Sequence, residues 1–270
     1  MHRGAWRFGM DRRDGEDRMT TANCARTLPL LPAPDGPWQA EFDRLIRGSR
    51  YLQVKYDRPR RLREKLDYIE RYCPEVCLPH TERPGLVLDV GPGPGEFIEW
   101  CRHFGRAAAG IDEEDGAGGM GTAYVKLCRM MHERQALNVS YEGFRLYLEF
   151  LREQPAPLGF LLVNFQGSWC YVWRDFLDGP PLDGYDMDTR HQQWRFSDRL
   201  DWEWERAFTI MRRHLVPGGS ILIWDNAVGE PSCQERFREA LVAAAWGAGL
   251  AVAANPEPLL FKLAVTAKAG

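Results

Sequence analysis

The chain has 270 residues, 44% of them hydrophobic and 27% charged, a composition typical of a soluble globular protein with a full core. Its formal net charge of −3 provides no positive field to gather phosphate backbones, so nucleic acid is not expected as a partner. The sequence has no start that resembles a secretory signal. It also has no apolar run that approaches the length of roughly 20 residues that a membrane-spanning helix needs. We therefore expect a cytoplasmic protein without membrane insertion.

The first 80 residues divide into a tail and a helical cap. Residues 1–35 mix arginines with acids and then pass into the proline-rich LPLLPAPDGP, which predicts a flexible tail. Residues 36–80 form the predicted cap, with helical patterns at about 37–48 and 59–73. The second pattern carries the basic run RPRRLREK, which we interpret as a solvated face, with a phosphate-binding role as the alternative.

The seven cysteines are an odd number for a disulfide framework, and we expect them to be reduced thiols. Cys73, Cys77 and His80 lie close together, and Cys101 or His103 could complete a tetrahedral metal site. The alternative is that Cys73 and Cys77 are small buried apolar residues. We favour the second interpretation and predict no metal site.

Residues 81–270 alternate short apolar runs with helical patterns, which predicts repeated β-α units around a parallel sheet. We predict strands at about 86–90, 107–111, 137–141, 158–165 and 219–225, and helices at about 95–104, 118–136, 144–153 and 200–214. The last two runs, LAVAA and LLFKLAVTAK, are joined by too few residues for a helical crossover and should pair antiparallel. The predicted fold class is α/β, with a Rossmann-like, mostly parallel seven-stranded sheet, a final antiparallel hairpin and helices on both faces.

The stretch LVLDVGPGPGEF places a glycine-rich turn directly after the first strand. In open α/β sheets such a turn, at the carboxyl end of a strand, is where nucleotides bind. A dinucleotide fingerprint would need a third glycine at the position that Glu96 occupies, and an acid there would repel a pyrophosphate. A nicotinamide oxidoreductase is therefore a disfavoured alternative.

The same stretch resembles the D/E-x-G-x-G-x-G signature of the class I S-adenosylmethionine-dependent methyltransferases, as Asp89-Val90-Gly91-Pro92-Gly93-Pro94-Gly95. The resemblance spans about residues 85–268, including the strand order and HLVPGGSILIWDN. It implies that 81–270 is a cofactor-binding methyltransferase domain. It also implies that the turn, with Asp89, Gly91, Pro92, Gly93 and Gly95, holds the methionine and ribose parts of S-adenosylmethionine.

Two further segments are expected to bind the cofactor. Asp112 ends the second strand, 23 positions after Asp89, where a carboxylate can accept both ribose hydroxyls; a helix N-cap is its alternative role, and Glu113 is a weaker substitute. The resemblance places adenine beyond the third strand, where this chain has Glu142, Gly143 and Phe144 in place of the frequent Gly-Asp pair. Simple packing is the alternative role for Phe144.

The resemblance also implies that the end of the fourth strand faces the methyl group. Here that strand reads LLVNFQGSWCYVW, so Asn164 is assigned to the cofactor, and Gln166, Ser168, Trp169 and Tyr171 are assigned to the acceptor substrate. The N-P-P-Y type of signature is absent, which disfavours exocyclic or amide nitrogens as acceptors. Asp225 and Asn226 end the fifth strand, where they could contact substrate or cap the next segment.

Residues 166–200 form a predicted lid insertion. Residues 165–204 contain ten of the chain's 32 aromatic residues, about twice the number that even spreading would give. Connections of this length in a compact domain often close over a ligand, and a helical insert packed on the sheet is the alternative. His191 is the one histidine of this segment and the candidate general base.

The remaining histidines are interpreted as structural or surface residues. His103 and His132 lie within predicted helices, whereas His2 and His80 fall outside the sheet region. His214 ends a helix, where a cationic side chain would suit the helix dipole.

The sequence thus predicts a methyltransferase that uses S-adenosylmethionine and acts on a small molecule, a lipid or a glycan precursor. A non-catalytic protein that keeps the fold to bind a partner is the alternative. The oligomeric state does not follow from the sequence.

Overall fold

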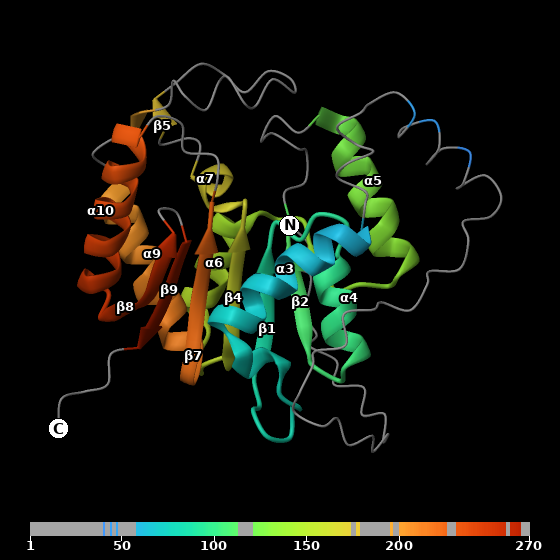
Figure 1. Ribbon diagram of the computed structural model, residues 1–270, viewed down its shortest axis with the longest axis horizontal. Helices are drawn as coiled ribbons and strands as arrows, with labels where there is room; N and C mark the ends of the chain where they lie inside the picture. Colours follow the sequence, from blue (N-terminus) through green and yellow to red (C-terminus); the bar gives the residue numbers. More distant parts are fainter. Residues whose placement is uncertain are drawn as a thin grey trace.

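The computed structural model describes residues 58–112, 121–173, 177–178, 195–196, 200–225, 231–257 and 260–265, together with positions 40, 44 and 47 (Figure 1). The predicted tail, most of the 37–48 helix, and most of the predicted lid, including His191, lie outside these ranges. Asn226 and Glu113 lie outside them too.

A seven-stranded sheet forms the centre of the described chain, in the order β3-β2-β1-β4-β7-β9-β8. The strands are β1 (Leu86–Val90), β2 (Ala108–Ile111), β3 (Val139–Ser140), β4 (Phe160–Gln166), β7 (Leu215–Trp224), β8 (Leu250–Glu257) and β9 (Leu260–Val265). β9 runs antiparallel to both neighbours, whereas the β1–β2, β1–β4, β2–β3 and β4–β7 pairs are parallel. The predicted fold class, with its final antiparallel hairpin, is confirmed.

Helices cover both faces of this sheet (Figure 1). One layer contains α3 (Arg58–Tyr72) and α4 (Glu96–His103), and α5 (Gly121–Arg134) lies beside α4 near β2. The other contains α6 (Phe144–Glu153), α9 (Leu200–His214) and α10 (Pro231–Gly247). A short 3₁₀ helix, η1 (Pro74–Cys77), follows α3, and a one-turn helix, α7 (Trp169–Val172), follows β4.

Two apolar cores hold these layers to the sheet. On the α3–α4 side, Leu62 and Leu66 pack with Phe97, Leu162 and Leu222. On the other side lies a larger core that is rich in aromatic rings from β4, α6, α7, α9 and α10. Leu161 and Leu162 of β4 enter the core on the α3–α4 side, whereas Phe160, Val163 and Phe165 enter the larger one. The strand is therefore buried from Phe160 to Phe165, as expected for a central strand of a parallel sheet.

The insertion after β4 contains a small antiparallel pair of strands. β5 (Leu177–Asp178) pairs with β6 (Arg195–Phe196), in the register Leu177 with Phe196. This pairing joins two segments within the predicted 166–200 lid.

The cysteines differ in part from expectation. Cys73, Cys101 and Cys128 are buried and form no disulfide, but Cys77 is disulfide-bonded, so the prediction that all thiols are reduced is wrong. In the described part of the chain no three His, Cys, Asp or Glu side chains are grouped to hold a metal ion. No helix there has the length and apolar character needed to cross a membrane.

Candidate functional site

The glycine turn joins β1 to α4 at the carboxyl edge of the sheet. Gly91, Gly93 and Gly95 have φ angles of 71°, 58° and 81°, in the left-handed region that side chains disfavour. Space imposes a second requirement, because a Cβ on Gly91 would lie 2.7 Å from Ser168 Cβ, and one on Gly95 would contact His132 and Leu137. Pro92 is buried beside Gly110 of β2. The main chain is therefore sharply bent and held between α5 and the end of β4.

Ser168 supports this turn from the neighbouring strand. Its Oγ donates a 2.6 Å hydrogen bond to the carbonyl of Val90, the last residue of β1. Next to it, the Gly167 N–H donates to the Trp224 carbonyl at 2.6 Å. Ser168 was assigned to the acceptor substrate, and it is buried with its hydroxyl bonded to β1.

Asp89 is fully buried and has two partners. Asn164 Nδ2, on the adjacent β4, donates to Asp89 Oδ1 at 2.7 Å, and Lys65 Nζ, on α3, lies 2.9 Å from Asp89 Oδ2. Asn164 is itself buried, and its Oδ1 has no hydrogen-bond partner among the described residues. The strand register places Asp89 directly beside Asn164, so these two side chains meet on the face that α3 covers.

The solvated-face interpretation of RPRRLREK is wrong for two residues. Lys65 is 3% exposed, and Arg61 turns inward to place its Nε 3.0 Å from Glu96 Oε1. A helix with apolar residues at Leu62, Leu66 and Ile69 buries one face, and Arg61 and Lys65 lie on the same side. These cations are matched to the two buried acids that flank the glycine turn.

Glu96 consequently does not present a bare charge at the start of α4. Burial alone would raise its pKa, but the charges of Arg61 and Lys65 and hydrogen bonds hold the pKa below its ordinary value. Its second carboxylate oxygen, Oε2, is buried and has no hydrogen-bond partner in the part of the chain that the structure describes. A Glu96 carboxylate paired in this way would repel a pyrophosphate less than a bare acid would.

Asp112 stands one strand away from the turn. It follows β2 immediately, its N–H donates to the Ser140 carbonyl at 2.8 Å, and its carbonyl accepts from the Gly143 N–H at 3.0 Å. The Gly91 N–H donates to the carbonyl of Ile111, the preceding residue, at 2.8 Å. The half-buried Asp112 is thereby tied both to the glycine turn and to the segment that follows β3.

The residues that follow β3 differ in their exposure to solvent. Glu142 is exposed, Gly143 precedes α6 with a φ of 79°, and Phe144 is 2% exposed. The Phe144 ring meets Phe165 edge-on, with 4.9 Å between centroids. Packing in the larger core thus accounts for Phe144.

The residues assigned to the acceptor substrate are not all at one place. Gln166 ends β4 and is half-buried. Trp169 is fully buried and stacks on Phe208 of α9 at 5.2 Å, so it belongs to the core. Tyr171 lies in α7, and Asp225 is buried at the end of β7.

Besides Arg61 and Lys65, sequence reasoning missed the place of His132 in the site. Its Nε2 lies 2.7 Å from the Gly93 carbonyl, and its Nδ1 lies 2.8 Å from the Tyr141 hydroxyl. The helical pattern contained a usable signal, because His132 follows the buried Cys128 by four residues and shares its face of α5. The pattern indicated burial but could not identify the partners.

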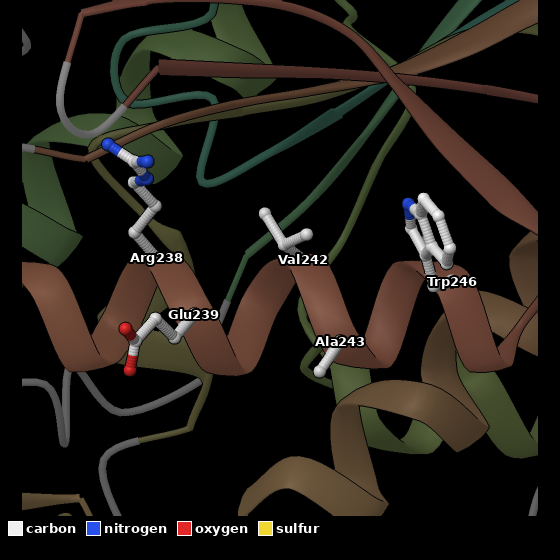
Figure 2. Close-up of a pocket in the computed structure, with 5 residues that line it drawn as sticks. All are labelled: Arg238, Glu239, Val242, Ala243 and Trp246. Carbon is white, nitrogen blue, oxygen red and sulfur yellow. The ribbon is translucent and has the colours of Figure 1, made fainter.

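A shallow hollow on α10 lies apart from this site. Figure 2 shows its lining residues, Arg238, Glu239, Val242, Ala243 and Trp246, all on one helix. α10 covers the opposite face of the sheet from α3 and α4. The hollow contains no group of the glycine turn.

Comparison with known proteins gives matches among solved structures alone, since no family and no curated protein matches the sequence. An S-adenosylmethionine-dependent methyltransferase from Archaeoglobus fulgidus is 18% identical, with 78% of this chain and 74% of that one covered and a TM-score of 0.37. An O-methyltransferase family protein from Burkholderia thailandensis is 14% identical, with 84% and 67% covered and a TM-score of 0.38. Human N-acetylserotonin methyltransferase, solved with S-adenosylmethionine, is 12% identical, with 84% and 59% covered and a TM-score of 0.40.

Proposed function

We propose that this chain is an S-adenosylmethionine-dependent methyltransferase that acts on a small molecule, a lipid or a glycan precursor. The observation that carries the proposal is the pairing of a side-chain-free bend after β1 with a carboxylate, Asp112, at the end of the neighbouring β2. The bend would let main chain approach an amino-acid-bearing nucleoside, and the carboxylate would accept its ribose hydroxyls.

The residues around the turn fit such a cofactor. S-adenosylmethionine carries a sulfonium and an amino-acid zwitterion, and it has no phosphate. The acids near the turn are buried and already balanced by Arg61 and Lys65, so no excess of positive charge marks a phosphate site. Asn164 Oδ1 and Glu96 Oε2 are buried acceptors without partners in the described chain, which suits a ligand rich in donors.

Each remaining assignment gives a role to this chain's own groups. The main chain of Gly91, Gly93 and Gly95, with Pro92 and the adjoining Asp89 and Asn164, would hold the methionine and ribose parts. Glu142 and Gly143 would border adenine. Gln166 and Tyr171, with Ser168 and Trp169 behind them, would shape the acceptor side, and His191 would serve as general base where the acceptor needs one.

When bound, the cofactor supplies an electrophilic methyl carbon on its sulfonium. The protein's share of catalysis is then mainly alignment of the acceptor and exclusion of water, for which effective molarities reach roughly 10⁵ M or more. The 166–200 insertion would provide that exclusion. The β5–β6 pair supports this role because it joins two segments within the insertion.

A direct test is calorimetric titration of the protein with S-adenosylhomocysteine, the demethylated product. Asp112→Ala should weaken binding at least tenfold, because the ribose hydroxyls lose a charge-assisted acceptor. Asp201→Ala is the matched control, since Asp201 is an exposed acid on α9, far along the chain from the turn. Equal affinity of the two variants would reject the ribose assignment.

A non-catalytic binding protein is the second candidate, and one observation favours it. The Lys65 ammonium already pairs with Asp89, the acid that begins the glycine signature, as in a site that no longer receives a cationic ligand. Absence of any heat with S-adenosylmethionine or its product would favour this candidate over the enzyme.

A further inference from the structure

His132 is a buried side chain that joins two segments far apart in the sequence. It is 2% exposed, with Nε2 lying 2.7 Å from the Gly93 carbonyl oxygen and Nδ1 lying 2.8 Å from the Tyr141 hydroxyl. Gly93 is the middle glycine of the turn after β1, and Tyr141 directly follows β3. Both ring nitrogens are therefore engaged, and one imidazole spans the gap between the two segments.

The chemistry of the partners fixes the proton positions. A carbonyl oxygen only accepts, so His132 Nε2 carries the hydrogen and donates it to Gly93. In a neutral ring Nδ1 then has a free lone pair, which accepts from the Tyr141 hydroxyl. Burial, and after it the charge of Asp112, raises the pKa of Tyr141, so the phenol keeps the proton it donates.

The surroundings leave this ring little freedom. A Cβ on Gly95 would lie 3.0 Å from His132 Cδ2, so the turn packs directly on the imidazole edge. On the other side, the Arg129 guanidinium lies over the Tyr141 ring, 4.4 Å from its centroid. The imidazole thus lies between the main chain of the turn and Tyr141, whose ring Arg129 covers.

We propose that His132 is a positioning residue that fixes the distance between the glycine turn and the 141–144 segment. The proposal rests on the proposed function for what lies between them: the turn would hold the methionine and ribose end of the cofactor and 142–144 the adenine end. The spacing itself is a property of the protein without ligand. A residue that only fills space in the core would not need either hydrogen bond.

The decisive variant is Tyr141→Phe, which removes one hydroxyl and keeps the ring. Tyr147→Phe is the control, because Tyr147 lies on α6 in the larger core, away from His132, whereas Tyr141 is half-buried beside it. His132→Phe removes both hydrogen bonds and keeps an aromatic ring. Should His132→Phe fail to fold, Tyr141→Phe still decides the matter.

The first readout needs no ligand. Amide hydrogen exchange of the peptide 90–97 should rise roughly three- to tenfold in Tyr141→Phe, since loss of a hydrogen bond within the bridge loosens the turn at its far end. Ring ¹⁵N shifts of wild-type His132 should report the Nε2–H tautomer. Exchange in Tyr141→Phe equal to that in Tyr147→Phe, or an Nδ1–H tautomer, would overturn the proposal.

The second readout separates this proposal from the proposed function. If wild type binds no S-adenosylhomocysteine, the proposed function fails, and the exchange experiment alone decides the positioning role. If wild type binds, Tyr141→Phe should weaken binding about fivefold while Tyr147→Phe leaves it unchanged. Faster exchange with unaltered affinity would overturn the claim that this spacing serves the cofactor.

Discussion

Lys65 Nζ lies 2.9 Å from Asp89 Oδ2, and the two side chains are only 4% and 0% exposed. With Arg61 and Glu96, this contact fastens α3 to both ends of the glycine turn. A buried charge is costly unless it is paired and hydrogen-bonded, and Asp89 meets both conditions through Lys65 and Asn164. The turn is therefore held from the helix before the sheet, as well as from β4.

Lys65→Met should lower the free energy of unfolding by about 3 to 5 kcal/mol, because it leaves the buried Asp89 carboxylate without its counter-ion. Arg60→Met, on the same helix, should change it by less than about 0.5 kcal/mol, because the Arg60–Glu64 pair is more than half exposed. Urea denaturation monitored by tryptophan fluorescence measures both. Similar losses of unfolding free energy in the two variants would show that the buried Lys65–Asp89 pair stabilises the fold no more than the exposed pair does.

Gly91→Ala should be more destabilising than Gly105→Ala. Both glycines have φ near 70°, which costs a side chain roughly 1 to 2 kcal/mol, but a Cβ on Gly91 meets Ser168 at 2.7 Å, whereas one on Gly105 meets nothing within 4 Å. The steric part adds about 1 to 3 kcal/mol and should be relieved by adding Ser168→Gly. Denaturation of all three proteins tests this, and equal losses in the two single variants would contradict it.

Local sequence patterns predicted most of the fold. The helix expected at 144–153 is Phe144–Glu153 and that at 200–214 is Leu200–His214, because apolar periodicity and flanking glycines act over a few residues. The strand expected at 137–141 is shorter, Val139–Ser140, since it lies at the sheet edge and pairs only with β2. β7 begins at Leu215 instead of 219, where Leu215 pairs with Phe160 across a register shift.

The sequence predicted less of the candidate site than of the fold. The bend at Gly91–Gly95 and the place of Asp112 are local features of strand ends, so spacing was sufficient to place them beside each other. Lys65 and His132 reach partners 24 and 39 residues away. Helical periodicity gives the face of such a residue, but the partner depends on how helix and sheet pack.

His214 should make stability depend on pH. Its Nδ1 accepts from the Leu158 N–H and its Nε2 lies against the Leu151 carbonyl, and burial lowers the pKa of His214 below 6.5 in the folded state. The lowered pKa is consistent with the structural role predicted for His214. It is not consistent with the predicted cationic side chain at the helix end. The unfolded chain binds the proton first, so this contribution is present above about pH 6.5 and is lost as pH falls below it.

The measurement is the difference in unfolding free energy between wild type and His214→Gln across pH 5 to 7.5. That difference should shrink as pH falls, because only wild type loses the contribution of a buried neutral imidazole. His80, whose pKa burial also lowers, is common to both proteins and cancels. A difference that is constant over this range would contradict the assignment.

The buried thiols should be inert in the native protein. Burial raises the pKa of Cys73 to about 11 and raises that of Cys101 further, so neither forms appreciable thiolate at pH 8. Iodoacetamide followed by peptide mass mapping should label neither in buffer and both in urea. Rapid native labelling of Cys101 would show that the α4 core opens far more often than the packing implies.

The central claim is that the bend at Gly91–Gly95 and the Asp112 carboxylate together hold an amino-acid-bearing nucleoside. A crystal structure of the protein grown with S-adenosylhomocysteine tests it most directly. Density for the nucleoside should lie against the main chain of the bend, with both ribose hydroxyls within hydrogen-bond distance of Asp112. Ligand density elsewhere, or an Asp112 carboxylate turned away from the ribose of a bound ligand, would contradict it.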